Sequence, residues 1–115
     1  MNLNNDMTSI SIVIPVYNAE DSIGKLVDEL VLELNHHYDL LIVLVNDNSQ
    51  DNSEEVCIAL HKRYKGLVSF YSLSKNVGEH NSVMAGLNNI SGDYVVIMDD
   101  DFQNPISEVI KLISY

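Results

Sequence analysis

The fold is decided by residues 10–47, which read ISIVIPVYNAEDSIGKLVDELVLELNHHYDLLIVLVND. Residues 10–15 are rich in β-branched side chains and end at a proline, which is typical of a buried strand. Apolar side chains then recur at helical spacing over residues 23–34, and residues 40–45 form a second, continuous apolar strand. The stretch therefore predicts a strand–helix–strand unit whose two strands run parallel.

The same alternation continues beyond this unit. It predicts strands at residues 68–73 and 94–98, and helices at residues 56–64, 83–90 and 107–113. Continuous apolar strands joined by crossover helices are typical of an α/β fold, a three-layer α/β/α sandwich around a mostly parallel sheet. We expect one domain over residues 9–115, preceded by a disordered, Asn-rich tail at residues 1–8.

Helix ends are marked by short polar residues. Asn18 is expected to cap the first helix, with Glu20 and Asp21 in its first turn. Asp51 and Glu54 have the spacing of a capping box before the second helix. That helix is expected to carry Val56, Ala59, Leu60 and Tyr64 on its apolar face and to stop at Gly66.

Composition excludes several classes of partner. The 115-residue chain has 17 acidic and 6 basic residues and a net charge of −11. Nucleic acids and anionic membrane surfaces require a basic footprint, so neither is expected to bind. The single cysteine, Cys57, cannot form an internal disulfide and is expected to be a buried, unreactive thiol. Without a signal peptide or a long apolar run, the chain is expected to be cytoplasmic.

Polar loops follow the four predicted strands, at residues 15–18, 46–51, 74–80 and 99–105. The carboxyl ends of parallel strands meet at one edge of the sheet, where α/β proteins bind their ligands. The candidate site is therefore this edge.

Three adjacent carboxylates follow the fourth strand. In an extended segment, Asp99 and Asp101 point to one side and Asp100 to the other. Crowded carboxylates and hard oxygen ligands favour a divalent cation, Mg²⁺ or Mn²⁺, shared with the phosphates of a ligand. The alternative is a solvated acidic turn.

Two other loops carry weaker signals. Asp47 could accept a hydrogen bond from the imide of uracil or the ring donors of guanine, or it could form an ordinary Asx turn. Asn76 and Gly78 indicate a turn with positive φ that lets a nucleotide approach closely. His80, at the start of the next predicted helix, could contact a phosphate.

Four motifs in order, SIVIPVYNAEDSI, VNDNSQDNS, LSKNVGEHNSVMAGLNNISGDYVVIMDDD and FQNP, resemble the inverting GT-A glycosyltransferases, the large family that includes dolichyl-phosphate mannosyltransferase. The likeness is strongest to the bacterial branch that acts on undecaprenyl phosphate, and it spans Ile10 to about Ile113.

The resemblance implies metal-dependent, inverting transfer of a sugar from a UDP- or GDP-sugar to a polyprenyl phosphate or a glycan. Asp99 and Asp101 would hold Mg²⁺ or Mn²⁺, Asp47 would bind the base, and Gln103 would lie near the donor sugar. Residues implied in binding the nucleotide sugar are Pro15, Tyr17, Asn18, Glu20, Asp47, Asn76, Gly78, Asp99, Asp100 and Gln103.

The chain departs from the family in places. Asn46 stands where the family commonly has aspartate, and Asn48 where it often has glycine. The family's domain is roughly twice as long, beyond a minimal single core. The remainder would carry the general base and, in this branch, membrane helices that would place the protein at the cytoplasmic face of the membrane. We therefore assign no catalytic base, and expect the uncovered apolar surface to form a homodimer.

Other functions use the same elements differently. A non-catalytic nucleotide- or metal-binding module from a shortened gene would keep the site without turnover. Phosphotransfer receivers and Asp-nucleophile phosphatases place acidic residues after the first strand, where this chain has Pro-Val-Tyr-Asn. A dinucleotide dehydrogenase would have Gly-x-Gly-x-x-Gly there, and that motif is absent.

Overall fold

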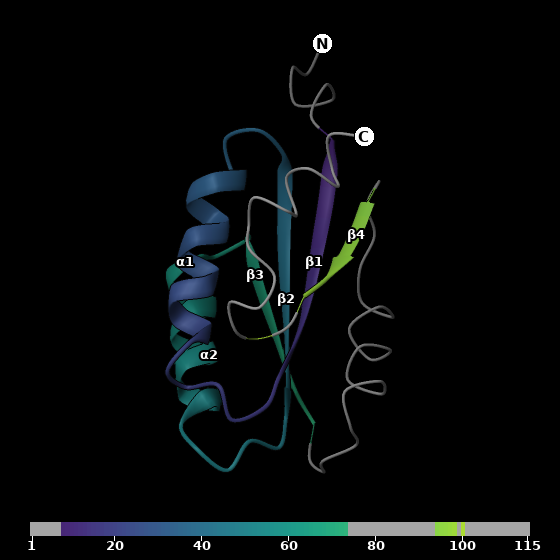
Figure 1. Ribbon diagram of the computed structural model, residues 1–115. Helices are drawn as coiled ribbons and strands as arrows, with labels where there is room; N and C mark the ends of the chain where they lie inside the picture. Colours follow the sequence, from purple (N-terminus) through teal and green to yellow (C-terminus); the bar gives the residue numbers. More distant parts are fainter. Residues whose placement is uncertain (1–7, 74–93, 99, 101–115) are drawn as a thin grey trace.

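The computed structural model describes residues 8–73, 94–98 and 100 (Figure 1). Its elements are β1 (Ser9–Val16), α1 (Ile23–Leu34), β2 (Asp39–Asp47), α2 (Ser53–Arg63), β3 (Val68–Leu73) and β4 (Tyr94–Ile97). The four strands form one parallel sheet in the order β3-β2-β1-β4. The predicted α/β fold with a parallel sheet is confirmed, as are the strands and the two helices predicted in the described part.

Strand order changes direction at β1. The chain moves outward from β1 to β2 and β3, and then returns to place β4 on the other side of β1. The β1–β4 ladder pairs Ile10 with Tyr94 through Val13 with Ile97, and the Met98 N–H adds a last bond to the Val13 carbonyl at 3.1 Å. Beyond that point β1 continues to Val16 while the chain after β4 leaves the ladder. In open α/β sheets, ligands bind at the carboxyl ends of the strands where the strand order reverses in this way.

Both described helices cover the same face of the sheet, as Figure 1 shows. Side chains at every second position of β1, from Ile10 to Val16, are at most 1% exposed and pack in one cluster with both helices. Helix α1 contributes its apolar face at helical spacing: Ile23, Leu26, Val27, Leu30 and Leu34. This face holds most of the described core. Fully burying one such side chain stabilises the fold by about 1.5–3 kcal/mol.

The opposite face buries a smaller cluster, Val13, Val43 and Val45. The helices predicted to form the third layer, at residues 83–90 and 107–113, lie outside the described residues. So does the predicted tail up to residue 7, whereas the Thr8 carbonyl already accepts the Asp39 N–H at 2.9 Å.

Helix α2 packs differently from the prediction. Ala59, expected on its apolar face, is exposed, and the buried positions are Ser53, Cys57 and Leu60. The expected burial of Cys57 is confirmed. Burial, with the negative charges of nearby carboxylates, raises the pKa of this thiol to about 12, so it is no nucleophile at neutral pH.

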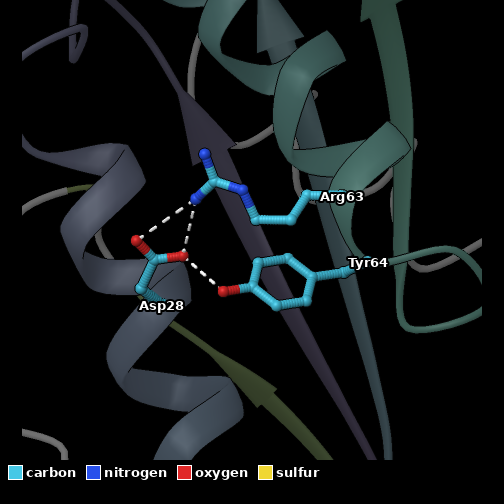
Figure 2. A network of polar contacts seen from close by, with 3 residues as sticks. All are labelled: Asp28, Arg63 and Tyr64. Atoms are coloured by element: carbon cyan, nitrogen blue, oxygen red, sulfur yellow. Dashed lines mark hydrogen bonds and ion pairs between the residues drawn. The ribbon is translucent and has the colours of Figure 1, made fainter.

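A polar cluster joins the two helices on their outer side (Figure 2). Asp28 of α1 accepts a hydrogen bond from the Tyr64 hydroxyl at 2.5 Å and pairs with Arg63 at 3.2 Å. The ion pair is largely solvent-exposed and adds little energy by itself. The hydrogen bond to Asp28, with burial and the carboxylate charge, raises the pKa of Tyr64.

The helix ends correct one prediction. The cap of α1 is Ser22, not Asn18, and no acidic residue lies in its first turn, so the placement of Glu20 and Asp21 there was wrong. The reason is a tertiary contact. Asn18 is hydrogen-bonded to the loop between β2 and α2, and helix α1 begins only at Ile23, after this contact. Gly66, at φ +84°, ends the second helical segment as predicted.

Candidate functional site

The carboxyl ends of β1, β2 and β4 meet at one edge, as the sequence predicts. Two loops lie there, residues 17–22 between β1 and α1 and residues 48–52 between β2 and α2, together with Asp100 after β4.

Asn18 links the two loops. Its backbone is left-handed, with φ 49°, a conformation that asparagine tolerates better than most residues. Its side-chain oxygen accepts the Gln50 N–H at 2.7 Å, and its own N–H donates to the Ser49 hydroxyl at 3.1 Å. Asn18 therefore shapes the loop through its backbone and side chain together.

Ser53 and Asp51 form a second link beneath the first. The fully buried Ser53 hydroxyl accepts the Ala19 N–H at 2.7 Å and donates to the Asp51 carboxylate at 2.6 Å. The same carboxylate accepts the N–H groups of Ser53 at 2.9 Å and Glu20 at 3.1 Å. Burial pushes the pKa of Asp51 upward, but these hydrogen bonds outweigh it and hold the pKa below its usual value.

The predicted capping box is not formed. The N-cap of α2 is Asn52, and Asp51, one residue before it, accepts the Ser53 N–H, whereas the Glu54 carboxylate accepts a hydrogen bond from the Ser72 hydroxyl at 2.9 Å. Glu54 thus joins α2 to β3 instead of closing back on its own helix.

Asn46 and Asp47, the last residues of β2, point to opposite faces of the sheet because side chains alternate along a strand. Asn46 is buried on the helix face, where its side chain accepts from Ser49 at 2.5 Å and donates to Ser72 at 3.4 Å. Asp47 is 4% exposed and lies on the face of Val43 and Val45. The sequence predicts Asp47 as a ligand residue but gives Asn46 no structural role.

A polar hollow of about 280 Å³ opens beside these residues on the helix side. Its lining is Asn46, Asn48, Ser49, Asp51, Glu54, Glu55, Ser72 and Leu73. Asp47 does not line it, so this hollow is distinct from the place predicted for a base.

Asp100, which follows β4, contacts the loop between β1 and α1. Its carboxylate accepts the Tyr17 N–H at 2.8 Å, and its carbonyl accepts the Ser22 hydroxyl at 2.8 Å. Tyr17 itself remains 44% exposed beside this contact. Residues separated by about eighty positions in the chain are therefore in direct contact at the predicted edge.

Of the other predicted site residues, Pro15 is buried at the end of β1 and Glu20 is exposed in the loop that follows. Asn76, Gly78, His80, Asp99, Asp101 and Gln103 lie outside the described residues. Within the described part, no three His, Cys, Asp or Glu side chains are grouped to hold a metal ion. No helix in that same part is long and apolar enough to cross a bilayer.

Residues 11–115 match the family model described as glycosyl transferase family 2. The chain is 38% identical to the undecaprenyl-phosphate 4-deoxy-4-formamido-L-arabinose transferases of Yersinia pestis (strain Pestoides F) and Yersinia pseudotuberculosis serotype O:3. Each alignment covers 98% of this chain and 35% of the relative, so the chain spans about a third of the length of these proteins.

Solved structures show the same fold. The mannosyltransferase PcManGT of Pyrobaculum calidifontis, in complex with GDP-Man and Mn²⁺, superposes with a TM-score of 0.75 at 19% identity, over 85% of this chain and 29% of that one. S. aureus TarS 1-349 in complex with UDP-GlcNAc superposes with a TM-score of 0.70 at 22% identity, over 92% of this chain and 31% of that one.

Proposed function

Because the chain belongs to glycosyl transferase family 2 and has the GT-A fold, we propose that it binds a nucleotide-diphosphate sugar at the carboxyl edge of β1, β2 and β4. In this proposal it forms the donor-binding half of an inverting glycosyltransferase. The observation that carries the proposal is the contact between Asp100 and the β1–α1 loop, because it joins the acidic segment after β4 to the loop that contains Tyr17 and Asn18.

The base would bind through Asp47. Asp47 is 4% exposed at the end of β2, and its carboxylate would accept a hydrogen bond from the N–H of uracil or guanine. Tyr17, exposed at the neighbouring strand end, offers an aromatic face to the base. Pro15, Asn18 and Glu20 would complete the wall on the β1 side.

The diphosphate would be bound through Mg²⁺ or Mn²⁺. Asp99 and Asp101 would hold the ion, and their hard oxygens suit either metal. The fit rests on the described residue between them, Asp100, whose carboxylate accepts the Tyr17 N–H at the carboxyl end of β1. A bound divalent cation supplies charge neutralisation for the leaving nucleotide. Two fold relatives, PcManGT and GalNAc-T7, were solved with Mn²⁺.

The acceptor would be a polyprenyl phosphate or a glycan. The Yersinia relatives are named for undecaprenyl phosphate, which favours a lipid phosphate and action at the cytoplasmic face of a membrane. Asn76 and Gly78 would approach the nucleotide, and Gln103 the sugar. No general base is assigned among these residues.

The proposal is tested by thermal unfolding with UDP, GDP, CDP or ADP, each in Mn²⁺ and in EDTA. Ligand at about 100 times its Kd adds about 2.7 kcal/mol of stability. We expect one nucleotide to raise the Tm in Mn²⁺ only. Asp47→Asn should abolish the shift, while Asp39→Asn, the same change at the opposite end of β2, should retain it.

The outcomes bear on the candidate functions. Sugar transfer to undecaprenyl phosphate by the chain would exclude a non-catalytic nucleotide- and metal-binding module, whereas a shift without transfer is expected both of that module and of a donor-binding half. No shift with any nucleotide would refute donor binding by this chain.

A further inference from the structure

A series of hydrogen bonds passes through the side chain of Asn46. The Ser49 hydroxyl accepts the Asn18 N–H at 3.1 Å and donates to the Asn46 side-chain oxygen at 2.5 Å. The Asn46 amide nitrogen donates to the Ser72 hydroxyl at 3.4 Å, and that hydroxyl donates to the Glu54 carboxylate at 2.9 Å. These five residues, here called the Asn46 network, join the loops after β1 and β2 to the end of β3 and the first turn of α2.

All hydrogen bonds in the Asn46 network run in one direction. A backbone N–H only donates and a carboxylate only accepts, so the two ends, Asn18 and Glu54, fix the direction of the bonds between them. The residue in the middle must accept from Ser49 and donate to Ser72, and a side-chain amide does both. Asn46 is 2% exposed, so water does not readily replace a lost partner. The network therefore requires an amide at position 46.

Aspartate has nearly the same shape as asparagine but lacks the donor. In Asn46→Asp, the Ser72 hydroxyl would lie between two carboxylates and could donate to only one of them. Adding Glu54→Gln supplies a new donor, because the glutamine amide can donate to Ser72 while the Ser72 hydroxyl donates to the carboxylate at position 46. The double substitution therefore restores each bond with part of the network reversed, and it leaves the net charge of the chain unchanged.

The Asn46 network also connects the two residues that are proposed to contact the base. Asp47 follows Asn46 in β2, and Tyr17 precedes Asn18 after β1. The bonds from Asn46 through Ser49 to Asn18 tie these two strand ends together. Consecutive Cα atoms are about 3.8 Å apart, so the same bonds restrict where Asp47 can lie relative to Tyr17.

We propose that Asn46 is a positioning residue for base recognition, a role that rests on the proposed function above. The Asn46 network holds the Asp47 carboxylate where it accepts the ring N–H of uracil or guanine. Cytosine and adenine have an acceptor nitrogen at the corresponding ring position, and a site built around a hydrogen bond rejects analogues that cannot make it. The selectivity of the site for its base therefore depends on Asn46, whose side chain lies on the opposite face of the sheet from Asp47.

Base selectivity is measured by titration calorimetry of the 115-residue chain with UDP, CDP, GDP and ADP in one buffer that contains Mn²⁺. It is the ratio of the Kd for CDP to that for UDP, or of the Kd for ADP to that for GDP. Both nucleotides of a pair carry the same diphosphate, so contacts to metal and phosphate cancel in the ratio. Asn46→Asp should lower the ratio about fivefold, the loss expected for one hydrogen bond. Adding Glu54→Gln should restore it.

Asn52→Asp is the matched control. It makes the same change, and adds the same charge, at the exposed N-cap of α2 outside the Asn46 network, so the ratio should stay at the wild-type value. Equal losses in Asn52→Asp and Asn46→Asp would assign the effect to charge and overturn the proposal. A double substitution no more selective than Asn46→Asp would overturn it too. So would an Asn46→Asp chain with a lower Tm and unchanged selectivity, since the role of Asn46 would then be purely structural.

Failure of the proposed function gives a different result, because the wild-type chain would then bind no nucleotide or bind all four equally. Urea denaturation tests the Asn46 network without any ligand. The double substitution should lose less free energy of unfolding than the sum of the losses in Asn46→Asp and Glu54→Gln, because residues in one hydrogen-bond network are energetically coupled. Additive losses would overturn the network on which the proposal stands.

Discussion

Replacing Ser53 by alanine removes one hydroxyl that joins two loops of the site edge. The hydroxyl accepts the Ala19 N–H at 2.7 Å and donates to the Asp51 carboxylate at 2.6 Å. Ser53 is fully buried and Ala19 is 7% exposed, so water does not readily replace the lost contacts. We expect this substitution to be among the most destabilising single-atom deletions near the site.

The magnitude follows from the two bonds. Each contributes about 1 kcal/mol net, and leaving the buried Ala19 N–H without an acceptor adds a desolvation penalty of about 1 kcal/mol or more. The sum is a loss of about 3 kcal/mol in the free energy of unfolding. A domain of this size is stable by only about 5–15 kcal/mol, so the loss is easily measured by urea denaturation followed by circular dichroism.

The loss of unfolding free energy caused by Ser53→Ala should also depend on pH. Burial raises the pKa of Asp51, but the hydrogen bonds, with the Ser53 side chain first among them, bring the pKa below its usual 3.8. A depressed carboxyl pKa stabilises the fold above the unfolded value, and that stability is lost as the pH falls through the folded value. Ser53→Ala brings the folded pKa back toward 3.8. The difference in free energy of unfolding between wild type and variant should therefore be largest at neutral pH and become smaller as the pH falls below 3.8.

Ser72→Ala is the matched control. It deletes an exposed hydroxyl that donates to the Glu54 carboxylate at 2.9 Å and accepts a long hydrogen bond from the Asn46 amide at 3.4 Å, so it should cost only about 1 kcal/mol. A Ser53→Ala loss of stability as small as that of Ser72→Ala, or one that does not narrow as the pH falls below 3.8, would refute the reasoning.

Three other outcomes are expected. Gly66→Ala should lower the free energy of unfolding by about 1 kcal/mol because the φ of Gly66 is +84°. Gly24→Ala in α1 should raise it by about 0.5–1 kcal/mol, because the new Cβ meets only one atom, at 3.8 Å. If urea denaturation shows that both substitutions change the free energy of unfolding in the same direction, this prediction is wrong. Asp28→Asn should lower the pKa of Tyr64 toward its usual value, measured by the ultraviolet absorbance of the phenolate; an unchanged titration would show that Asp28 does not perturb it. Exposed apolar side chains on β4 should drive dimerisation that Ile97→Lys weakens; a clean monomer in sedimentation at high concentration would count against it.

The described fold could be predicted from the sequence because the apolar side chains of its strands and helices recur at clear spacings. The β-branched run of β1 and the helical spacing of α1 each match one structure and exclude the other. Helix α2 has a weaker pattern, and there the prediction placed Ala59 inside although it is exposed. Its burial is set by packing against β3 and α1, which a local pattern does not contain.

The site could be predicted in position but not in its bonding. The rule for parallel sheets located the edge, and it brought Tyr17 and Asp100 to one place. What the sequence did not indicate is that Asn18 caps no helix and instead accepts from Gln50, or that Ser22 bonds across the sheet. The run of short polar residues at 46–53 was the available signal, but such residues form caps, turns and cross-loop bonds equally well.

The same bonds explain how an acidic chain tolerates carboxylates at one edge. Among the described residues, Asp51 and Asp100 accept hydrogen bonds there from the N–H groups of Glu20, Ser53 and Tyr17. The described ion pair between Arg63 and Asp28 involves the last residue of α2, a helix that begins at this edge and runs away from it. Backbone donors satisfy individual oxygens but bring no net positive charge. A site built in this way remains electronegative and favours a divalent cation, and this is why we expect nucleotide binding to require Mn²⁺ and to be lost in EDTA.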